Sequence, residues 1–224
     1  RNASGEFEHV ARLIPNQLGV QRLDISERRV VATGLSADPT AGRVLVFDLP
    51  ADLSQPARRH EDFQGGSASA WTALPGSTFS VVTTPTSRVY RQSSLAGDAG
   101  SLLGGLDWTD QSIQADVRPI AFNGSDRWFG LVTRYRDANN YYYVTARSSN
   151  VILLRKMANG AFTTLASASL PIELNATRNL RLEAVGSLLR VFVDDVKLLE
   201  ARDTAHTHGQ AGLMMYKTRA DYDN

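Results

Sequence analysis

The chain has 224 residues and contains no cysteine. Disulfide bonds, thiolate metal sites and cysteine nucleophiles are therefore excluded. A chain of this length does not need such cross-links, because it can bury a hydrophobic core large enough to be stable. The fold must rest on the packing of secondary structure alone.

The chain also lacks an excess of charge of either sign. Lys and Arg number 24 and Asp and Glu number 23, which gives a net charge of +1. Such a balance does not draw a protein to nucleic acid or to an anionic membrane. No run is long and apolar enough to span a bilayer, and the polar start RNASGEFEH is unlike a signal peptide. We expect no nucleic-acid partner and no membrane insertion, and the oligomeric state stays open.

The sequence does contain a regular rhythm of strands and turns. Four runs between residues 126 and 164 are separated by turn residues at 137–140, 148–150 and 158–160. Asn, Asp, Gly and Ser in such short gaps are typical of hairpin turns. The spacing predicts four consecutive antiparallel strands.

Alternation along these strands divides their side chains between two faces. In the second run, the dry face consists of Tyr142, Val144 and Ala146. The half-polar face of the same run consists of Tyr141, Tyr143, Thr145 and Arg147. In the first run, one face consists of Phe129, Leu131, Thr133 and Tyr135. The opposite face of that run consists of Trp128, Gly130, Val132 and Arg134.

A strand face that mixes Trp, Tyr and Arg has two interpretations. It suits a ligand platform, because sugar rings stack on aromatic side chains while Arg donates forked hydrogen bonds. Aromatic and β-branched residues are also the ordinary content of strands. The pattern alone leaves both interpretations open.

Residues 1–60 lack this rhythm. Residues 9–14 predict one or two helical turns that end at Pro15, and the proline-containing stretch 50–60 is typical of a linker. Three segments alternate like strands, at 19–24, 29–33 and 43–48. From residue 61 onward the pattern is all-β, with further strands predicted at 106–118, 179–185, 188–193, 196–200 and 211–218. In the first of these, one face consists of Ile113, Ala115 and Val117.

The order of several motifs resembles a known family. EDFQ, AWTAL, VYRQSS, DWTDQSIQADVRP, FNGSDRWFGLVTRYRDANNYYYV, LRLEAVGSLLRVFVDD and GQAGLMMYKTRADYDN follow one another as in the concanavalin A-like or laminin G-like jelly rolls of bacterial secreted polysaccharide-active proteins. The resemblance covers residues 61–224. It implies an antiparallel β-sandwich of jelly-roll type. Residues 1–60 precede it, and from their own pattern we expect an N-terminal extension that packs on the main domain or adds strands to it. It also implies a secreted or extracellular bacterial protein.

Members of that family have a short valine-rich strand after the motif that corresponds to DYDN. The chain ends at Asn224, at this motif. We expect residues 44–49 to supply a substitute strand beside Tyr222.

The resemblance further implies a binding site and an ion. Ligands of related proteins lie on the concave sheet face or its loop rim, so the expected partner is a polysaccharide or oligosaccharide. The expected carbohydrate contacts are Trp128, Arg134, Tyr141, Tyr143, Arg147 and Tyr216. A structural Ca²⁺ is expected where the first and last strands meet, held by Glu61, Asp62, Asp221 and Asp223.

The expected function is that of a carbohydrate-binding module, and two alternatives stay open. A laminin G-like interaction or adhesion domain would share the fold. A polysaccharide lyase or glycoside hydrolase would need a catalytic constellation, such as two carboxylates about 5 Å apart or an Arg beside a Tyr or His base. Neither has a diagnostic spacing here. Glu183 is expected to pair with an Arg on the strand surface, and His206 and His208 to lie exposed in a loop.

Overall fold

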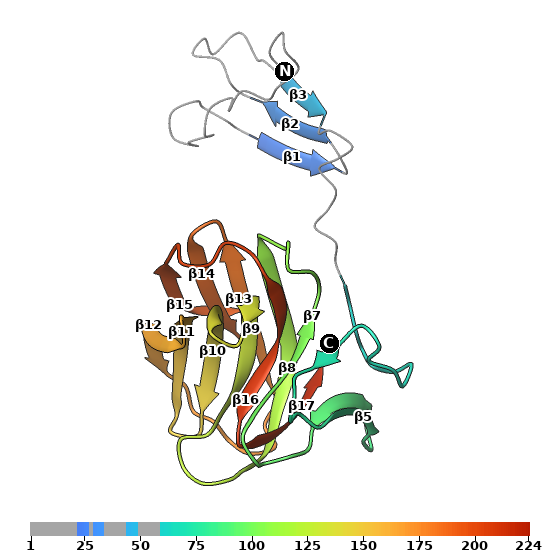
Figure 1. Cartoon of the computed structure of the whole chain (residues 1–224). Coiled ribbons are helices and arrows are strands. Elements are labelled where there is room, and N and C mark those ends of the chain that lie inside the picture. Colours follow the sequence, from blue (N-terminus) through green and yellow to red (C-terminus); the bar gives the residue numbers. More distant parts are fainter. Residues whose placement is uncertain (1–21, 27–28, 34–43, 49–58) are drawn as a thin grey trace. The chain divides into compact units, whose positions relative to one another are not determined.

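The computed structural model describes residues 22–26, 29–33, 44–48 and 59–224 (Figure 1). The chain divides into two compact units, Arg1–Arg59 and His60–Asn224. The secondary structure of the described residues consists of strands, and no described helix is long and apolar enough to cross a membrane. The helical turns predicted at 9–14 and most of the linker predicted at 50–60 lie outside the described residues.

The first unit contains a small sheet of its own. Strands β1 (Arg22–Ser26), β2 (Arg29–Thr33) and β3 (Val44–Asp48) pair antiparallel in the order β1-β2-β3. These bounds lie within three residues of the predicted strands. The packing of this extension on the main domain stays a prediction.

The second unit is built from two seven-stranded antiparallel sheets, which confirms the predicted β-sandwich. The front sheet has the order β12-β11-β10-β9-β16-β7-β4. Its strands are β4 (Thr72–Ala73), β7 (Asp98–Leu103), β9 (Trp128–Asp137), β10 (Asn140–Arg147), β11 (Val151–Ala158), β12 (Ala161–Ser169) and β16 (Gln210–Tyr216). Strands β9 to β12 are neighbours in sequence and in space, so the predicted meander is confirmed.

The back sheet has the order β15-β14-β13-β8-β17-β6-β5. Its strands are β5 (Phe79–Thr83), β6 (Arg88–Gln92), β8 (Gln111–Phe122), β13 (Arg178–Val185), β14 (Leu188–Val193), β15 (Val196–Arg202) and β17 (Thr218–Asp223). The chain crosses from the front sheet to the back sheet between β16 and β17, at Lys217, whose φ of 47° is left-handed. The single strand predicted at 211–218 is thus two strands in two layers.

Strand β17 completes the back sheet without help from the first unit. Tyr222 pairs with Tyr90 of β6 on one side and with Val117 of β8 on the other. Val44–Asp48 pair with β2. Because both edges beside Tyr222 are occupied, the prediction that residues 44–49 form a strand there is wrong.

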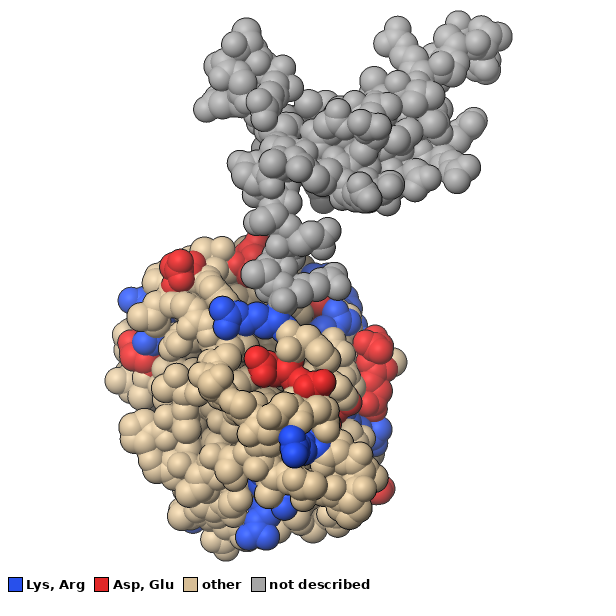
Figure 2. Space-filling view, turned by 90° about the vertical axis from the view of Figure 1, so that its right-hand side faces the viewer, with Lys and Arg blue, Asp and Glu red and all other residues tan. Residues whose placement is uncertain are grey.

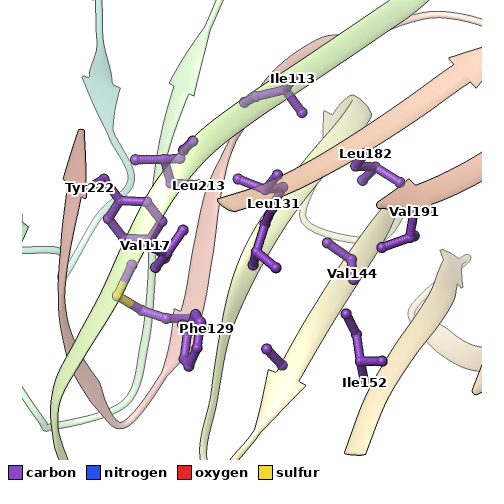
Figure 3. Packing of buried hydrophobic residues seen from close by; sticks show 14 of the residues in the cluster. Ile113, Val117, Phe129, Leu131, Val144, Ile152, Leu182, Val191, Leu213 and Tyr222 are labelled. Carbon is purple, nitrogen blue, oxygen red and sulfur yellow. The ribbon is translucent and has the colours of Figure 1, made fainter. Parts of the chain in front are cut away.

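The hydrophobic core lies between the two sheets. Leu131 and Val144 of the front sheet point toward Val117 and Leu182 of the back sheet, and all four are fully buried (Figure 3). The inward faces predicted for β10 and β8 are confirmed, since their members belong to this core. Those members are Tyr142, Val144, Ala146, Ile113, Ala115 and Val117.

Candidate functional site

A second hydrophobic cluster lies on the outer face of the front sheet. Its central members alternate with core residues along β9 and β10, so they point away from the back sheet. Trp128, Tyr141 and Tyr143 belong to it, as the alternation of these strands predicts. The other members are Leu102, Val132, Tyr135 and Met214, with Leu74, Met157 and Tyr216 packed against them.

Four aromatic rings form a continuous strip within this cluster, which we call the aromatic strip. The ring centres of Trp128 and Tyr143 are 5.8 Å apart, those of Tyr143 and Tyr141 are 5.1 Å apart, and those of Tyr141 and Tyr135 are 5.3 Å apart. These are the distances of favourable tilted, edge-to-face and stacked pairs. The strip therefore holds its own rings in place before any ligand arrives.

Gly130 allows strands β9 and β10 to approach below this strip. A Cβ atom at this position would lie 1.8 Å from the carbonyl oxygen of Val144 on the paired strand. Gly130 stands opposite Thr145, whose hydroxyl is buried and has no hydrogen-bond partner. The floor between Trp128 and Tyr143 is therefore made of backbone and one small side chain.

The rings of the strip are almost fully covered. Trp128, Tyr141 and Tyr143 are 9%, 6% and 4% exposed. The back sheet lies on the opposite side, so this cover comes from neighbours on the same outer face. A sugar ring has no open ring face to stack on here, but the hydroxyls of Tyr135 and Tyr141 have no hydrogen-bond partner among the described residues.

A β-bulge corrects the faces predicted for β9. Arg134 has a left-handed φ of 50°, and the pairing of β9 with β10 and β16 shifts register around it. The extra residue reverses the alternation. Tyr135 therefore joins Trp128 on the outer face, whereas the sequence assigned it to the opposite one.

The same bulge buries Arg134, which is 2% exposed. Its guanidinium donates hydrogen bonds to the carbonyl oxygens of Thr109 at 3.0 Å, Gly186 at 2.8 Å and His206 at 2.9 Å. The side chain ties three loops together at one end of the sandwich. Arg134 is thus a structural residue. The expectation that it contacts a carbohydrate is wrong, because its side chain is buried.

Charged groups surround the aromatic strip. Arg147 forms a two-pronged ion pair with Asp126, with Nε–Oδ1 and Nη2–Oδ2 distances of 2.7 and 2.8 Å. Hydrogen bonds from Arg147 lower the pKa of Asp126 to about 2. The guanidinium of Arg155 lies 4.2 Å from the ring centre of Phe162, and its Nε donates to the hydroxyl of Thr164 at 3.3 Å.

The tyrosine hydroxyls of the strip stay protonated. Burial raises the pKa of Tyr135, Tyr141 and Tyr143, so these phenols remain proton donors at neutral pH. Asp98 opposes Tyr216 across β7 and β16, and its charge contributes to the raised pKa of Tyr141. Partial burial raises the pKa of Asp98 itself, although the residue is exposed overall.

Tyr216 is the half-buried ring of the outer face. The guanidinium carbon of Arg127 lies 5.1 Å from its ring centre, and the ammonium nitrogen of Lys217 lies 5.5 Å from it. We call Arg127, Tyr216 and Lys217 the Tyr216 corner. Cations at this distance are attracted to the ring.

The four carboxylates expected to bind calcium do not form one site. Asp221 accepts hydrogen bonds from Arg91 at 2.5 Å and from Arg118 at 2.7 Å, which occupy both of its oxygens. Asp62 and Asp223 are near enough for the charge of Asp62 to contribute to the raised pKa of Asp223. Among the described residues, no three Asp, Glu or His side chains are grouped as metal ligands. These residues do not fit a Ca²⁺ site built from side chains.

The residues considered for catalysis have structural roles. Glu183 is paired with Arg181 and Arg190, as predicted. His206 is 3% exposed, so the prediction that it lies exposed is wrong. Its Nε2 lies 2.6 Å from the carbonyl oxygen of Met157, and its backbone N–H donates to the hydroxyl of Tyr142. The imidazole is buried because it packs against Tyr142 of β10 and Met157 of β11.

The fold defines the class of protein. Two antiparallel sheets with this strand order form a concanavalin A-like jelly roll. A β-glucanase of Bacillus licheniformis has the same fold, with a TM-score of 0.54 and 13% identity over 74% of this chain and 94% of that chain. No protein-family model matches the sequence.

Two similar proteins come from Bacillus subtilis. The carbohydrate-binding module CBM66 is 25% identical, with a TM-score of 0.58, over 69% of this chain and 92% of that chain. A levanase of strain 168 is 25% identical over 124 residues, which are 55% of this chain and 18% of the levanase. The chain therefore matches less than a fifth of that enzyme's length.

Several candidate residues were not found from the sequence. Asp98, Asp126 and Arg155 reach the aromatic strip from different strands or loops, and Arg127 and Lys217 lie beside Tyr216. Asp126 and Arg127 carried a local signal, because they come just before the strand that contains Trp128, and Lys217 directly follows Tyr216 in the sequence. Arg155 lies opposite Tyr143 in the hairpin of β10 and β11, and Asp98 depends on the pairing of β7 with β16, which are far apart in sequence.

Proposed function

We propose that residues 60–224 form a carbohydrate-binding module that recognises a polysaccharide on the outer face of the front sheet. The observation that carries this proposal is the aromatic strip, a prearranged apolar floor whose exposed groups are phenol hydroxyls, carboxylates and guanidinium groups. An apolar floor with a few convergent polar groups is typical of small-ligand sites. The likeness to a carbohydrate-binding module supports the same function.

Recognition would use hydrogen bonds from the edges of the strip. Tyr141 and Tyr143 donate from their hydroxyls, Asp98 accepts from sugar hydroxyls, and Arg155 donates in a fork. Trp128 acts chiefly as support for Tyr143. Stacking is assigned to Tyr216, whose ring keeps free surface, and Arg147 remains a proposed contact at the rim beside Asp126.

The proposed ligand is a fructan of the levan type, and the proposed location is outside a bacterial cell. Both proposals are supported by the likeness to the levanase, whose name indicates the polysaccharide it acts on. Binding requires no catalytic pair, and the carboxylates of the outer face are arranged around the strip as rim groups.

Affinity electrophoresis in gels that contain levan tests the proposal, with dextran gels as the reference. Levan should retard the wild-type protein, and Tyr216→Ala should weaken binding about tenfold. Phe192→Ala is the matched control, since Phe192 is a half-buried ring stacked with Arg181 on the outer face of the back sheet. An equal loss of levan affinity in both variants would show that the binding site is not on the front sheet. Absence of retardation by any polysaccharide in a wider panel would favour the protein-interaction alternative.

A further inference from the structure

The Tyr216 corner holds two cations against one ring at the end of the aromatic strip. Neither Arg127 nor Lys217 has a carboxylate partner among the described residues. Two like charges placed on the same ring repel each other, and an anion between them would offset that repulsion. The arrangement therefore points to a ligand group of negative charge.

Hydrogen bonds hold the guanidinium of Arg127 and the backbone of Lys217 in place. The Nε of Arg127 donates to the carbonyl oxygen of Asn123 at 2.6 Å, and the N–H of Asn123 donates to the carbonyl oxygen of Lys217 at 3.0 Å. The N–H of Lys217 in turn donates to the carbonyl oxygen of Gly97 at 2.8 Å. Three segments of the chain thus meet at one corner, where hydrogen bonds hold the Arg127 side chain and the Lys217 backbone.

The conformation of Lys217 is a second indication. Its φ of 47° is left-handed, a region in which a side chain is strained and glycine is not. The crossing between sheets would be relaxed by glycine at this position. Lys217 instead places an ammonium group beside Tyr216.

Two carboxylates, those of Asp126 and Asp98, lie near the corner, and neither forms an ion pair with Arg127 or Lys217. Asp126 is held by Arg147 and Ser149. The pKa of Asp98 is raised by burial, and a close cation would oppose that shift. Neither carboxylate therefore neutralises Arg127 or Lys217.

We propose that the Tyr216 corner is a subsite for an anionic group carried by a saccharide, such as a uronate carboxylate or a sulfate ester. This inference rests on the proposed carbohydrate-binding function and adds charge recognition to it. Arg127 contributes a planar donor that suits the oxygens of either group, and Lys217 contributes a point charge. Tyr216 supplies the ring against which the attached sugar packs.

Affinity electrophoresis with paired polysaccharides tests this subsite. Polygalacturonate is compared with its methyl ester, and dextran sulfate with dextran, so that each pair differs in charge. The wild-type protein should bind at least one anionic member about tenfold or more tightly than its neutral counterpart, and added salt should reduce the difference. A preference within the polygalacturonate pair identifies a carboxylate as the bound group, and a preference within the dextran pair identifies a sulfate.

Matched variants connect the charge preference to the corner. Arg127→Gln and Lys217→Gln should each reduce the preference about tenfold, and Arg127→Lys should keep part of it. Arg136→Gln is the control, because it removes one exposed cation at the opposite end of β9 and changes the net charge equally. Thermal melting of each variant confirms that it folds.

The outcomes separate this inference from the proposed function. Retardation by levan without any preference for anionic members would overturn the subsite and leave carbohydrate binding intact. A preference that survives in both glutamine variants would also overturn it. Loss of retardation by every polysaccharide would reject the proposed function itself.

Discussion

The carboxylate of Asp126 accepts two parallel hydrogen bonds from the guanidinium of Arg147, at 2.7 and 2.8 Å. Asp126 lies just before β9 and Arg147 ends β10, so the pair joins the two central strands at one end of the aromatic strip. Ser149 donates a third hydrogen bond to the same carboxylate at 2.9 Å. The site thus has a fixed charged rim at this end.

This ion pair should persist in mild acid. Because the pKa of Asp126 is lowered to about 2, its contribution to stability is complete above the unfolded-state pKa near 3.9 and is lost as pH falls through about 2. Asp126→Asn should lower the free energy of unfolding by about 0.2–1 kcal/mol, because the carboxylate is largely exposed. Urea unfolding should give the same difference at pH 7 and pH 5. A difference that disappears by pH 5 would contradict this.

Arg134 should be important for stability rather than for binding. Arg134→Met leaves the carbonyl oxygens of Thr109, Gly186 and His206 without their donor. We expect a loss of about 3–5 kcal/mol in the free energy of unfolding, measured by urea denaturation. Arg134→Lys should recover only part of it, because an ammonium group cannot reproduce the fork. If Arg134→Met weakened levan binding without lowering stability, Arg134 would be a binding residue after all.

Gly130 should not tolerate a side chain. The added methyl group of Gly130→Ala would collide with the carbonyl oxygen of Val144, so β9 or β10 must shift. A loss of about 1–3 kcal/mol is expected from thermal or urea unfolding. Gly65→Ala is the control, because nothing lies near its added Cβ atom. Similar losses for both variants would show that the close approach at Gly130 has no energetic consequence.

The phenol hydroxyl of Tyr141 should contribute to binding without contributing to stability. Tyr141→Phe removes a hydroxyl that has no partner among the described residues and keeps the ring contacts of the strip. Levan affinity should fall about two- to tenfold while the melting temperature stays the same or rises slightly. Tyr142→Phe is the opposite case, since its hydroxyl donates to Asp203 at 2.5 Å inside the sandwich. That variant should lose stability and keep its affinity when folded.

Calcium should have little effect on the second unit. Asp221 is neutralised by Arg91 and Arg118, so it is not free to bind a cation. The melting temperature of the protein should therefore be unchanged, within about 1 °C, after chelation and after addition of millimolar Ca²⁺. A rise that increases with Ca²⁺ concentration would show an ion site with ligands other than the expected carboxylates.

Figure 2 is consistent with recognition by local groups rather than by a general field. On the face of the second unit shown there, acidic and basic side chains are interspersed among uncharged ones (Figure 2). Together with a net charge of +1, this agrees with the expectation that no strong overall field acts on a partner. Charge recognition must then come from arrangements such as the Tyr216 corner.

The sequence by itself determined the all-β class, the meander and the division of β10 into a core face and an outer face. These follow from local rules, because turn residues end strands and side chains alternate, so Tyr141 and Tyr143 were correctly separated from Tyr142. Tertiary structure alone decided the faces around Arg134, the crossing at Lys217 and the meeting of Asp98 with Tyr216. A bulge or a crossing depends on the register between strands far apart in sequence. That register is set by which arrangement buries the core and satisfies the backbone, and no local pattern of residues contains this information.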